Sequence, residues 1–242
     1  MAYEARFVKD GNIKIGKMWS WSKLAGSGEI AGCKGTCGEH CSGCYNAQNP
    51  KKSPCYVFKS YVQYGWEKST VVKGHIRNTL VMRNNTTKAF EDIQAQLKRA
   101  RKKPIAVRVH ASGEIETVEE LAKWLETAKL SPNIPFYVYT KAYNIVDKVL
   151  TDTDPADLPK NFFINISIWH DNGIETYNKW KHLSCIRAFV YDDGQYDYSD
   201  KLKINCYCPA YDKKGKLNHD LTCDACKICF QEKAKVCGCY DH

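Results

Sequence analysis

The chain has 242 residues, 43% of them hydrophobic, and a formal net charge of +9. This length allows one or two domains and a core large enough to fold without cross-links. The sequence has neither an apolar leader nor an apolar run near the roughly 20 residues of a membrane helix, so we expect no membrane partner and a cytoplasmic location.

The excess of basic residues indicates an anionic partner such as nucleic acid. A soluble surface that is merely basic explains the charge as well. No aromatic-interleaved RNA motif or zinc-finger spacing favours nucleic acid further. A basic run at residues 98–103 closes a predicted helix, where cations also complement the helix dipole.

A cysteine-rich loop, residues 33–55, follows an extended lead-in in which Ile13 and Ile15 alternate as in a strand. Within the loop, Cys37, Cys41 and Cys44 form a C-x3-C-x2-C triplet among glycines that let the backbone curl. In a reducing compartment clustered cysteines more often bind metal than form disulfides. Backbone N–H groups of such a loop also bond to cluster sulfurs. We therefore expect an iron–sulfur cluster here, with Cys33 and Cys55 as further ligands or buried thiols.

From residue 85 onward, strand and helix patterns alternate. Apolar residues three or four apart predict helices after residue 85 and from residue 118, and shorter ones near residues 145 and 180. The apolar runs between them predict strands at 104–110, 135–140, 162–168 and 185–190. Such alternation is typical of parallel strands with right-handed crossovers. We predict an α/β fold, a partial or open (β/α) barrel, because the units are too few for a closed eight-fold one.

Polar side chains follow the predicted strands, where function collects in parallel β/α folds. Ser112 and Glu114 follow the first strand, and Lys141 follows the second. Arg108 and His110 alternate with valines, so we expect both to point into the barrel lumen.

The last segment, residues 201–242, reads as a cysteine-rich extension packed on the domain formed by residues 1–200. Cys223, Cys226 and Cys229 have the C-x2-C-x2-C spacing that opens the bacterial ferredoxin run, and Cys208 precedes a proline as the remote ligand does there. These four cysteines predict a second [4Fe-4S] cluster. Tetrahedral zinc between Cys206/Cys208 and Cys223/Cys226 is the alternative. The roles of Cys206, Cys237 and Cys239 stay open.

The triplet and the following β/α pattern resemble the radical S-adenosylmethionine (SAM) superfamily. That resemblance implies a [4Fe-4S] cluster held at Cys37, Cys41 and Cys44 through three irons, with the fourth iron open for SAM. Ser112-Gly113-Glu114 resembles the Gly-Gly-Glu turn of that superfamily. The resemblance places Glu114 or Ser112 at the SAM ammonium, with Asn165 or Ser167 lining the nucleoside. Gly43, rather than an aromatic residue, precedes the last cysteine of the triplet.

Landmarks across residues 13–230 resemble a narrower, phage-encoded family, the gene-product-88-like proteins. They are the Cys44-Tyr45 pair, the segment 108–114, the Tyr139-Thr140 strand end, and the tail cysteines with Cys208-Pro209. The resemblance implies a scaffold found in a phage-infected or bacterial cell, without implying a substrate.

Three functions compete on this reading. The first is a radical-SAM-like enzyme that needs an electron donor and acts on a small-molecule or nucleic-acid substrate. The second is a non-enzymatic iron–sulfur protein that binds nucleic acid or a host protein, with the fourth iron capped by Cys33 or Cys55. The third is a structural zinc protein. No catalytic residue is predicted.

Overall fold

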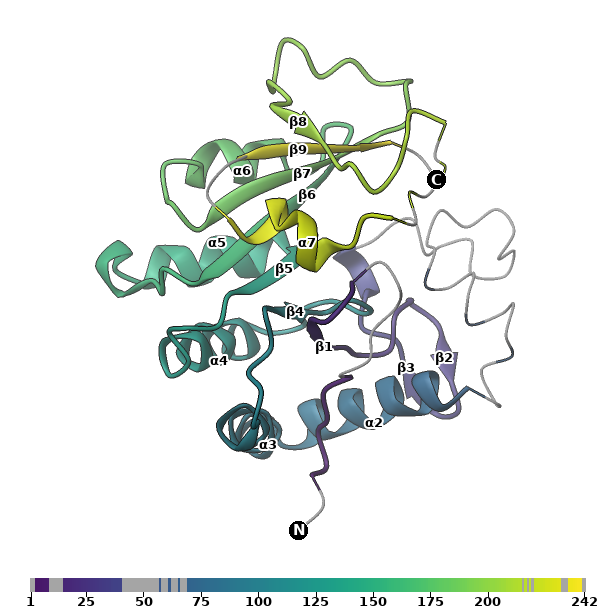
Figure 1. The fold of residues 1–242 in the computed structure, drawn as a ribbon, viewed down its shortest axis with the longest axis vertical. Helices are drawn as coiled ribbons and strands as arrows, with labels where there is room; N and C mark the ends of the chain where they lie inside the picture. Colours follow the sequence, from purple (N-terminus) through teal and green to yellow (C-terminus); the bar gives the residue numbers. More distant parts are fainter. Residues whose placement is uncertain are drawn as a thin grey trace.

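A seven-stranded, all-parallel sheet forms the centre of the computed structural model (Figure 1). The structure describes residues 3–8, 15–40, 57, 61, 65, 69–214, 216, 218, 220–231 and 235–240. In spatial order the strands are β1 (Trp19–Trp21), β4 (Val107–Val109), β5 (Phe136–Thr140), β6 (Phe162–Trp169), β7 (Ile186–Asp192), β9 (Val236–Tyr240) and β8 (Cys206–Tyr207). Among the described strands, β1 and β8 are the two ends of an open sheet. This confirms the α/β class, and no closed barrel is formed by the described residues.

Helices connect the strands, and their capping explains where they begin. They are α2 (Thr70–Asn84), α3 (Thr86–Arg99), α4 (Val118–Lys129), α5 (Tyr143–Asp152), α6 (Ile174–Trp180) and α7 (Cys223–Cys226). The side chain of Asn85 accepts the backbone N–H of Lys88 at the start of α3, and Thr117 accepts that of Glu120 in α4. Helix α4 also carries Glu119 in its first turn, which suits the helix dipole. None of the described helices has the length and apolarity needed to cross a bilayer.

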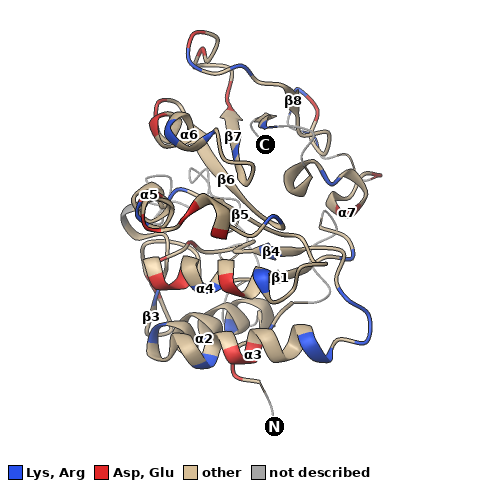
Figure 2. Ribbon diagram, turned by 90° about the vertical axis from the view of Figure 1, so that its left-hand side faces the viewer, with Lys and Arg blue, Asp and Glu red and all other residues tan. Residues whose placement is uncertain are grey.

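The sheet has two different sides. In β6, Phe162, Ile164 and Ile166 point into the large core shared with the helices, whereas Phe163 belongs to a separate cluster with Phe230 of the tail. Helices α4, α5 and α6 lie on one side of the strands and α7 lies on the other (Figure 2). We call the second side the tail face; it is the side of the sheet that bears Arg108, Tyr137, Tyr139, Phe163, Asn165, Arg187 and Cys237.

The β/α pattern from residue 85 to residue 192 is confirmed, with strand ends shifted by at most three residues. The prediction of a strand around Ile15 is wrong, because Ile15 lies in a turn; Ile13 lies outside the described residues. The first strand instead starts at Trp19, which pairs in parallel with Val107 and turns its ring into the helix-side core.

The tail contributes two strands that the sequence did not predict. Strand β9 pairs with β7, and β8 pairs with β9, so the tail extends the sheet at one edge. Gly238 at the centre of β9 is required by packing, since a Cβ there would lie 2.7 Å from the Tyr207 ring. The division of the chain at residue 200 into a domain and a tail stays a prediction.

Three short 3-10 turns and one small hairpin complete the described structure. The turns are η1 (Gly38–His40), η3 (Pro155–Asp157) and η4 (Ile228–Phe230). Strands β2 (Glu29–Ile30) and β3 (Cys33–Lys34) form the antiparallel hairpin at the start of the cysteine-rich loop. Turn η4 packs on β5 and β6, which brings the third cysteine of the tail motif onto the tail face.

Candidate metal centre

Five cysteines of the tail line one small cavity. They come from three separate segments and are Cys208, Cys223, Cys226, Cys229 and Cys237. The cavity has a volume of about 20 Å³, which is room for about one water molecule. None of the ten cysteines that the structure describes is joined in a disulfide. The four predicted tail ligands therefore lie together, and Cys237 is an additional thiol at the same place.

The chain path between Cys223 and Cys229 explains how these thiols reach a common cavity. Cys223 and Cys226 stand one turn apart on α7, which ends when the backbone N–H of Lys227 bonds the carbonyl of Cys223 at 2.9 Å. Lys227 has a left-handed φ of 61°, which few non-glycine residues adopt. This residue breaks the helix and starts turn η4, so Cys229 lines the same cavity from a new direction.

The tail face holds the turn that carries Cys229. The side chain of Asn165 donates to the carbonyl oxygens of Val138, at 3.1 Å, and Cys229, at 3.3 Å. The ring of Phe230 stacks on Tyr137 with 5.2 Å between ring centroids. These contacts with β5 and β6 hold the Cys229 turn in position against the sheet. Asn165, expected at a SAM nucleoside, here joins the sheet to the tail.

Burial favours the protonated form of three tail thiols, Cys226, Cys229 and Cys237. It raises the pKa of Cys229 to about 12, although the nearby Tyr139 hydroxyl opposes the rise. Neighbouring thiols, including Cys208 and Cys226, add to it. Burial likewise raises the pKa of Cys226 and of Cys237. Since a metal binds the thiolate, metal binding at this cavity would release protons and grow weaker as the pH falls.

The thiols are not arranged as a preformed site for one ion. Over the described ranges, no group of three or more His, Cys, Asp or Glu side chains is placed to hold a single metal ion. Sulfurs around tetrahedral zinc would stand about 3.8 Å apart, given Zn–S bonds of about 2.3 Å. In a [4Fe-4S] cluster each thiolate binds a different iron, which spreads the sulfurs more widely.

Cys37 is the one member of the N-terminal triplet within the described residues; Cys41 and Cys44 lie outside them. The backbone N–H of Gly26 points at the sulfur of Cys37 at 3.2 Å, and the N–H of Cys37 bonds the carbonyl of Gly26 at 3.0 Å. An N–H directed at sulfur is the contact that stabilises a cluster thiolate. Cys33 is buried on β3, and burial raises its pKa. Cys55 also lies outside the described residues.

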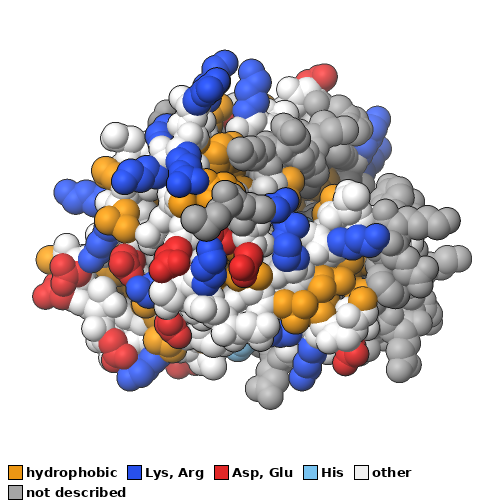
Figure 3. Space-filling view, turned by 90° about the horizontal axis from the view of Figure 1, so that it is seen from below, with side chains coloured by type: hydrophobic (Ala, Val, Ile, Leu, Met, Phe, Trp, Pro, Cys, Tyr) orange, Lys and Arg blue, Asp and Glu red, His pale blue; other side chains and the backbone are white. Residues whose placement is uncertain are grey.

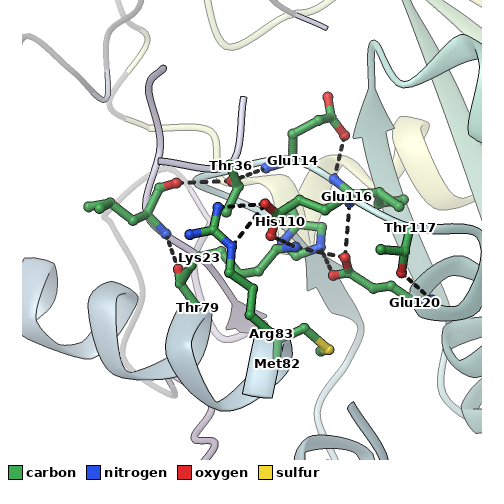
Figure 4. A network of polar contacts seen from close by, with 12 residues as sticks. Lys23, Thr36, Thr79, Met82, Arg83, His110, Glu114, Glu116, Thr117 and Glu120 are labelled. Atoms are coloured by element: carbon green, nitrogen blue, oxygen red, sulfur yellow. Dashed lines mark hydrogen bonds and ion pairs between the residues drawn. The ribbon is translucent and has the colours of Figure 1, made fainter. Parts of the chain in front are cut away.

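The Ser112-Gly113-Glu114 turn packs directly against the start of the cysteine-rich loop. The hydroxyl of Thr36 accepts the backbone N–H of Glu114 at 2.8 Å and donates to the carbonyl of Leu24 at 2.9 Å (Figure 4). Gly113 has a φ of 84°, and a Cβ there would lie 2.7 Å from the Thr36 hydroxyl. The Ser112-Gly113-Glu114 turn and the cysteine-rich loop, both of which the radical-SAM resemblance places at the SAM site, are therefore in contact.

Both side chains expected at the SAM ammonium are engaged with the protein. The buried carboxylate of Glu114 accepts the N–H groups of Ile115 and Lys141, each at 2.8 Å, and the hydroxyl of Thr140 at 2.7 Å. Burial raises its pKa, and these donors oppose the rise. The Ser112 hydroxyl donates to the carbonyl of Lys23 at 2.9 Å. These contacts tie the end of β4 to the end of β5 and to Lys23, which follows β1.

The remaining nucleoside candidate, Ser167, lies on β6 and is half-buried. Its backbone carbonyl accepts the hydroxyl of Tyr143 at 2.6 Å. On the neighbouring strand β7 it is level with Phe189, which in turn is level with Cys237. Ser167 therefore shares the tail face with the cysteine cavity.

The prediction that Arg108 and His110 point together into a barrel lumen is wrong, because Arg108 points to the tail face and His110 points toward the helices. His110 follows β4 with a left-handed φ of 54°, which turns its ring toward the helices. Its Nε2 lies 2.8 Å from a carboxylate oxygen of Glu120 on α4, and Lys23 binds the other oxygen at 2.7 Å. Burial alone would raise the pKa of Glu120, but Lys23 and His110 outweigh it and lower the pKa to about 2.

A second, more exposed ion pair continues this network to α2. Arg83 binds Glu116 (Figure 4). It also donates to the carbonyls of Lys34, at 2.6 Å, and Gly35, at 3.1 Å. Helix α2 thereby holds the base of the cysteine hairpin. Sequence reasoning missed this network, because the helix dipole alone explains acidic residues in the first turn of α4 and Lys23 lies 97 residues from Glu120.

The model of one protein family, described as Gene product 88, matches residues 6–232. The chain belongs to the Gene product 88 family. The match spans both the N-terminal cysteine loop and the tail motif, so the two cysteine regions are parts of one Gene product 88 chain. No curated protein and no solved structure matches this chain.

The surface of this Gene product 88 chain carries mixed charge. Basic side chains are interspersed with acidic ones on the face seen in Figure 3. In the predicted basic run, Lys103 donates to the carbonyls of Leu97 and Lys98 at the end of α3, and Arg99 bonds the hydroxyl of Tyr3. Part of the run therefore caps a helix, which gives it a role that needs no nucleic acid.

Proposed function

We propose that this Gene product 88 chain is an iron–sulfur protein whose tail binds a [4Fe-4S] cluster through Cys208, Cys223, Cys226 and Cys229. One observation carries the proposal: cysteines from three segments line a single cavity on the tail face. Thiolates are the ligands that such clusters take in proteins. The contacts that hold the Cys229 turn supply the positioning a cluster needs.

We propose a second cluster at Cys37, Cys41 and Cys44. The N–H of Gly26 directed at the Cys37 sulfur supports it, as does the packing of Thr36 against Glu114. SAM bound at an open iron would supply radical chemistry, and the chain's part would be to orient it and exclude water. For Glu114 to receive the SAM ammonium it would exchange one of its three present donors, for example the N–H of Lys141.

The metal content of the purified protein tests the proposal. After anaerobic expression and reconstitution we expect about eight irons per chain, from two four-iron clusters, with matching sulfide. Changing Cys223→Ser and Cys226→Ser together should remove about half of the iron. Cys185→Ala is the matched control, because Cys185 is a buried thiol that lies immediately before β7 and outside the cavity lining. Equal iron in all three proteins would refute the assignment of the tail ligands.

A separate assay tests the enzymatic part. The reconstituted protein, incubated with SAM and dithionite, should release 5′-deoxyadenosine, and Cys37→Ala should abolish the release. If an intact cluster gives no 5′-deoxyadenosine, the non-enzymatic function is favoured, in which Cys33 or Cys55 caps the fourth iron. In that case Cys33→Ala should either open the site to SAM or leave Cys55 as the capping ligand.

Structural zinc is a second candidate for the tail, because Cys208 and Cys226 line one cavity and Cys206, on β8, lies two residues before Cys208. A tetrahedral ion held by these thiols and Cys223 would bind without sulfide. Zinc near one atom per chain, with neither iron nor sulfide, would establish it and refute the iron–sulfur proposal.

A further inference from the structure

Two arginines of the sheet approach the turn that carries Cys229. Arg187 on β7 is only 2% exposed, and its Nη1 donates to the carbonyl of Ile228 at 3.3 Å. Its guanidinium lies over the ring of Phe163, 4.6 Å from the centroid. Arginine stays charged at any pH that proteins meet, so this is a permanent positive charge beside the cysteine cavity.

The second arginine acts through a tyrosine. The guanidinium of Arg108 on β4 lies 5.1 Å from the centroid of the Tyr139 ring. The Tyr139 hydroxyl is within hydrogen-bonding reach of the Cys229 thiol. The cysteine turn is therefore approached by Arg187 at a carbonyl and by the Arg108–Tyr139 pair at the sulfur.

Positive side chains near the cysteine cavity would favour the reduced state of a cluster bound there. A cluster held by four thiolates is anionic, and reduction adds one more negative charge to it. In the low-dielectric interior, a nearby cation favours the more negative state more strongly than it would in water. Hydrogen bonds to cluster sulfurs and the net charge around them set the reduction potential.

We propose that Arg187, together with Tyr139 backed by Arg108, raises the reduction potential of the tail cluster. This inference rests on the proposed function, because it requires a cluster at the cavity. Arg187 and Tyr139 are then tuning residues, and neither is a ligand of the iron.

The test is a redox titration of the reduced cluster signal, followed by electron paramagnetic resonance, in full-length protein that carries Cys37→Ala so that the tail signal is measured alone. Arg187→Gln removes the charge, Arg187→Lys keeps it, and Tyr139→Phe removes only the hydroxyl. Lys129→Gln, at the exposed end of α4 on the helix side, is the control for a change in net charge.

We expect Arg187→Gln and Tyr139→Phe to move the midpoint potential to more negative values while Arg187→Lys and Lys129→Gln stay near the parent protein. Unchanged potentials in both Arg187→Gln and Tyr139→Phe, with iron retained, would overturn the inference and leave the cluster proposal standing. If Arg187→Gln loses its iron, retention in Arg187→Lys supports the need for charge, and loss in both assigns Arg187 a packing role instead. Absence of iron from the parent protein would refute the proposed function itself.

Discussion

The buried Lys23–Glu120–His110 cluster allows a stability prediction with a worked magnitude. The side chains of Lys23 and Glu120 are 0% and 1% exposed, and their charged atoms lie 2.7 Å apart. Changing Glu120→Gln keeps the shape but leaves Lys23 with Glu116 as its remaining carboxylate. The pKa of Glu120 falls from 4.5 to about 2 in the folded protein. That fall corresponds to about 3 kcal/mol of stabilisation of the ionised form, and removal of one partner from a buried pair costs a similar amount.

The expected result is a lower free energy of unfolding for Glu120→Gln by about 3 kcal/mol at pH 7, measured by urea titration with tryptophan fluorescence. For a chain of this size the melting temperature should fall by roughly 6 to 12 °C. Because the folded pKa lies below the unfolded one, the stabilisation is present above pH 4.5 and is lost as the pH falls toward 2.

Glu126→Gln is the matched control on the same helix. Glu126 is 51% exposed and pairs with Lys123 at 2.9 Å. Glu126→Gln should therefore lower the free energy of unfolding by no more than about 0.5 kcal/mol. Equal effects of the two substitutions, or a loss below about 1 kcal/mol for Glu120→Gln, would refute the view that this cluster holds α4 to the strand ends.

Three further predictions concern other parts of the chain. Gly113→Ala should lower the melting temperature and the iron content together, because its Cβ would displace the Thr36 hydroxyl; equal iron in variant and parent would contradict this. Phe230→Ala should cost roughly 3 to 5 kcal/mol and expose the tail to protease, since the ring stacks on Tyr137; an unchanged digestion pattern would count against it. His75 has its pKa lowered to about 4 by burial and by His110, so the parent protein should lose about 3 kcal/mol of stability as the pH falls from 6.5 to 4. His75→Gln should flatten this part of the stability profile, and an identical profile would show that the imidazole stays accessible to protons.

The central strands and helices could be predicted because their apolar residues follow the period of the element, or form a continuous run where a strand is covered on both faces. In β6, for example, consecutive apolar and β-branched residues mark a strand buried on both sides. The tail strands could not be found in this way. In the sequence, Val236-Cys237-Gly238-Cys239-Tyr240 is marked only by two cysteines whose roles stay open. Its strand conformation depends on pairing with β7, which lies far away in the sequence.

In the candidate metal centre, too, local spacing could be predicted from the sequence and contacts between distant segments could not. The spacing of Cys223, Cys226 and Cys229 predicted a common centre, since one helical turn and one break bring them together. The environment of Glu114 was beyond sequence reasoning. Its donors, Thr140 and Lys141, lie at the end of the next strand and directly after it, and only the folded sheet brings them within reach.

Mössbauer spectroscopy of protein enriched in iron-57, with and without the Cys223→Ser and Cys226→Ser changes, tests the central claim most directly. The account predicts two four-iron clusters in the parent protein and the loss of one of them in the variant. Spectra without cluster iron, or with the same clusters in both proteins, would contradict it.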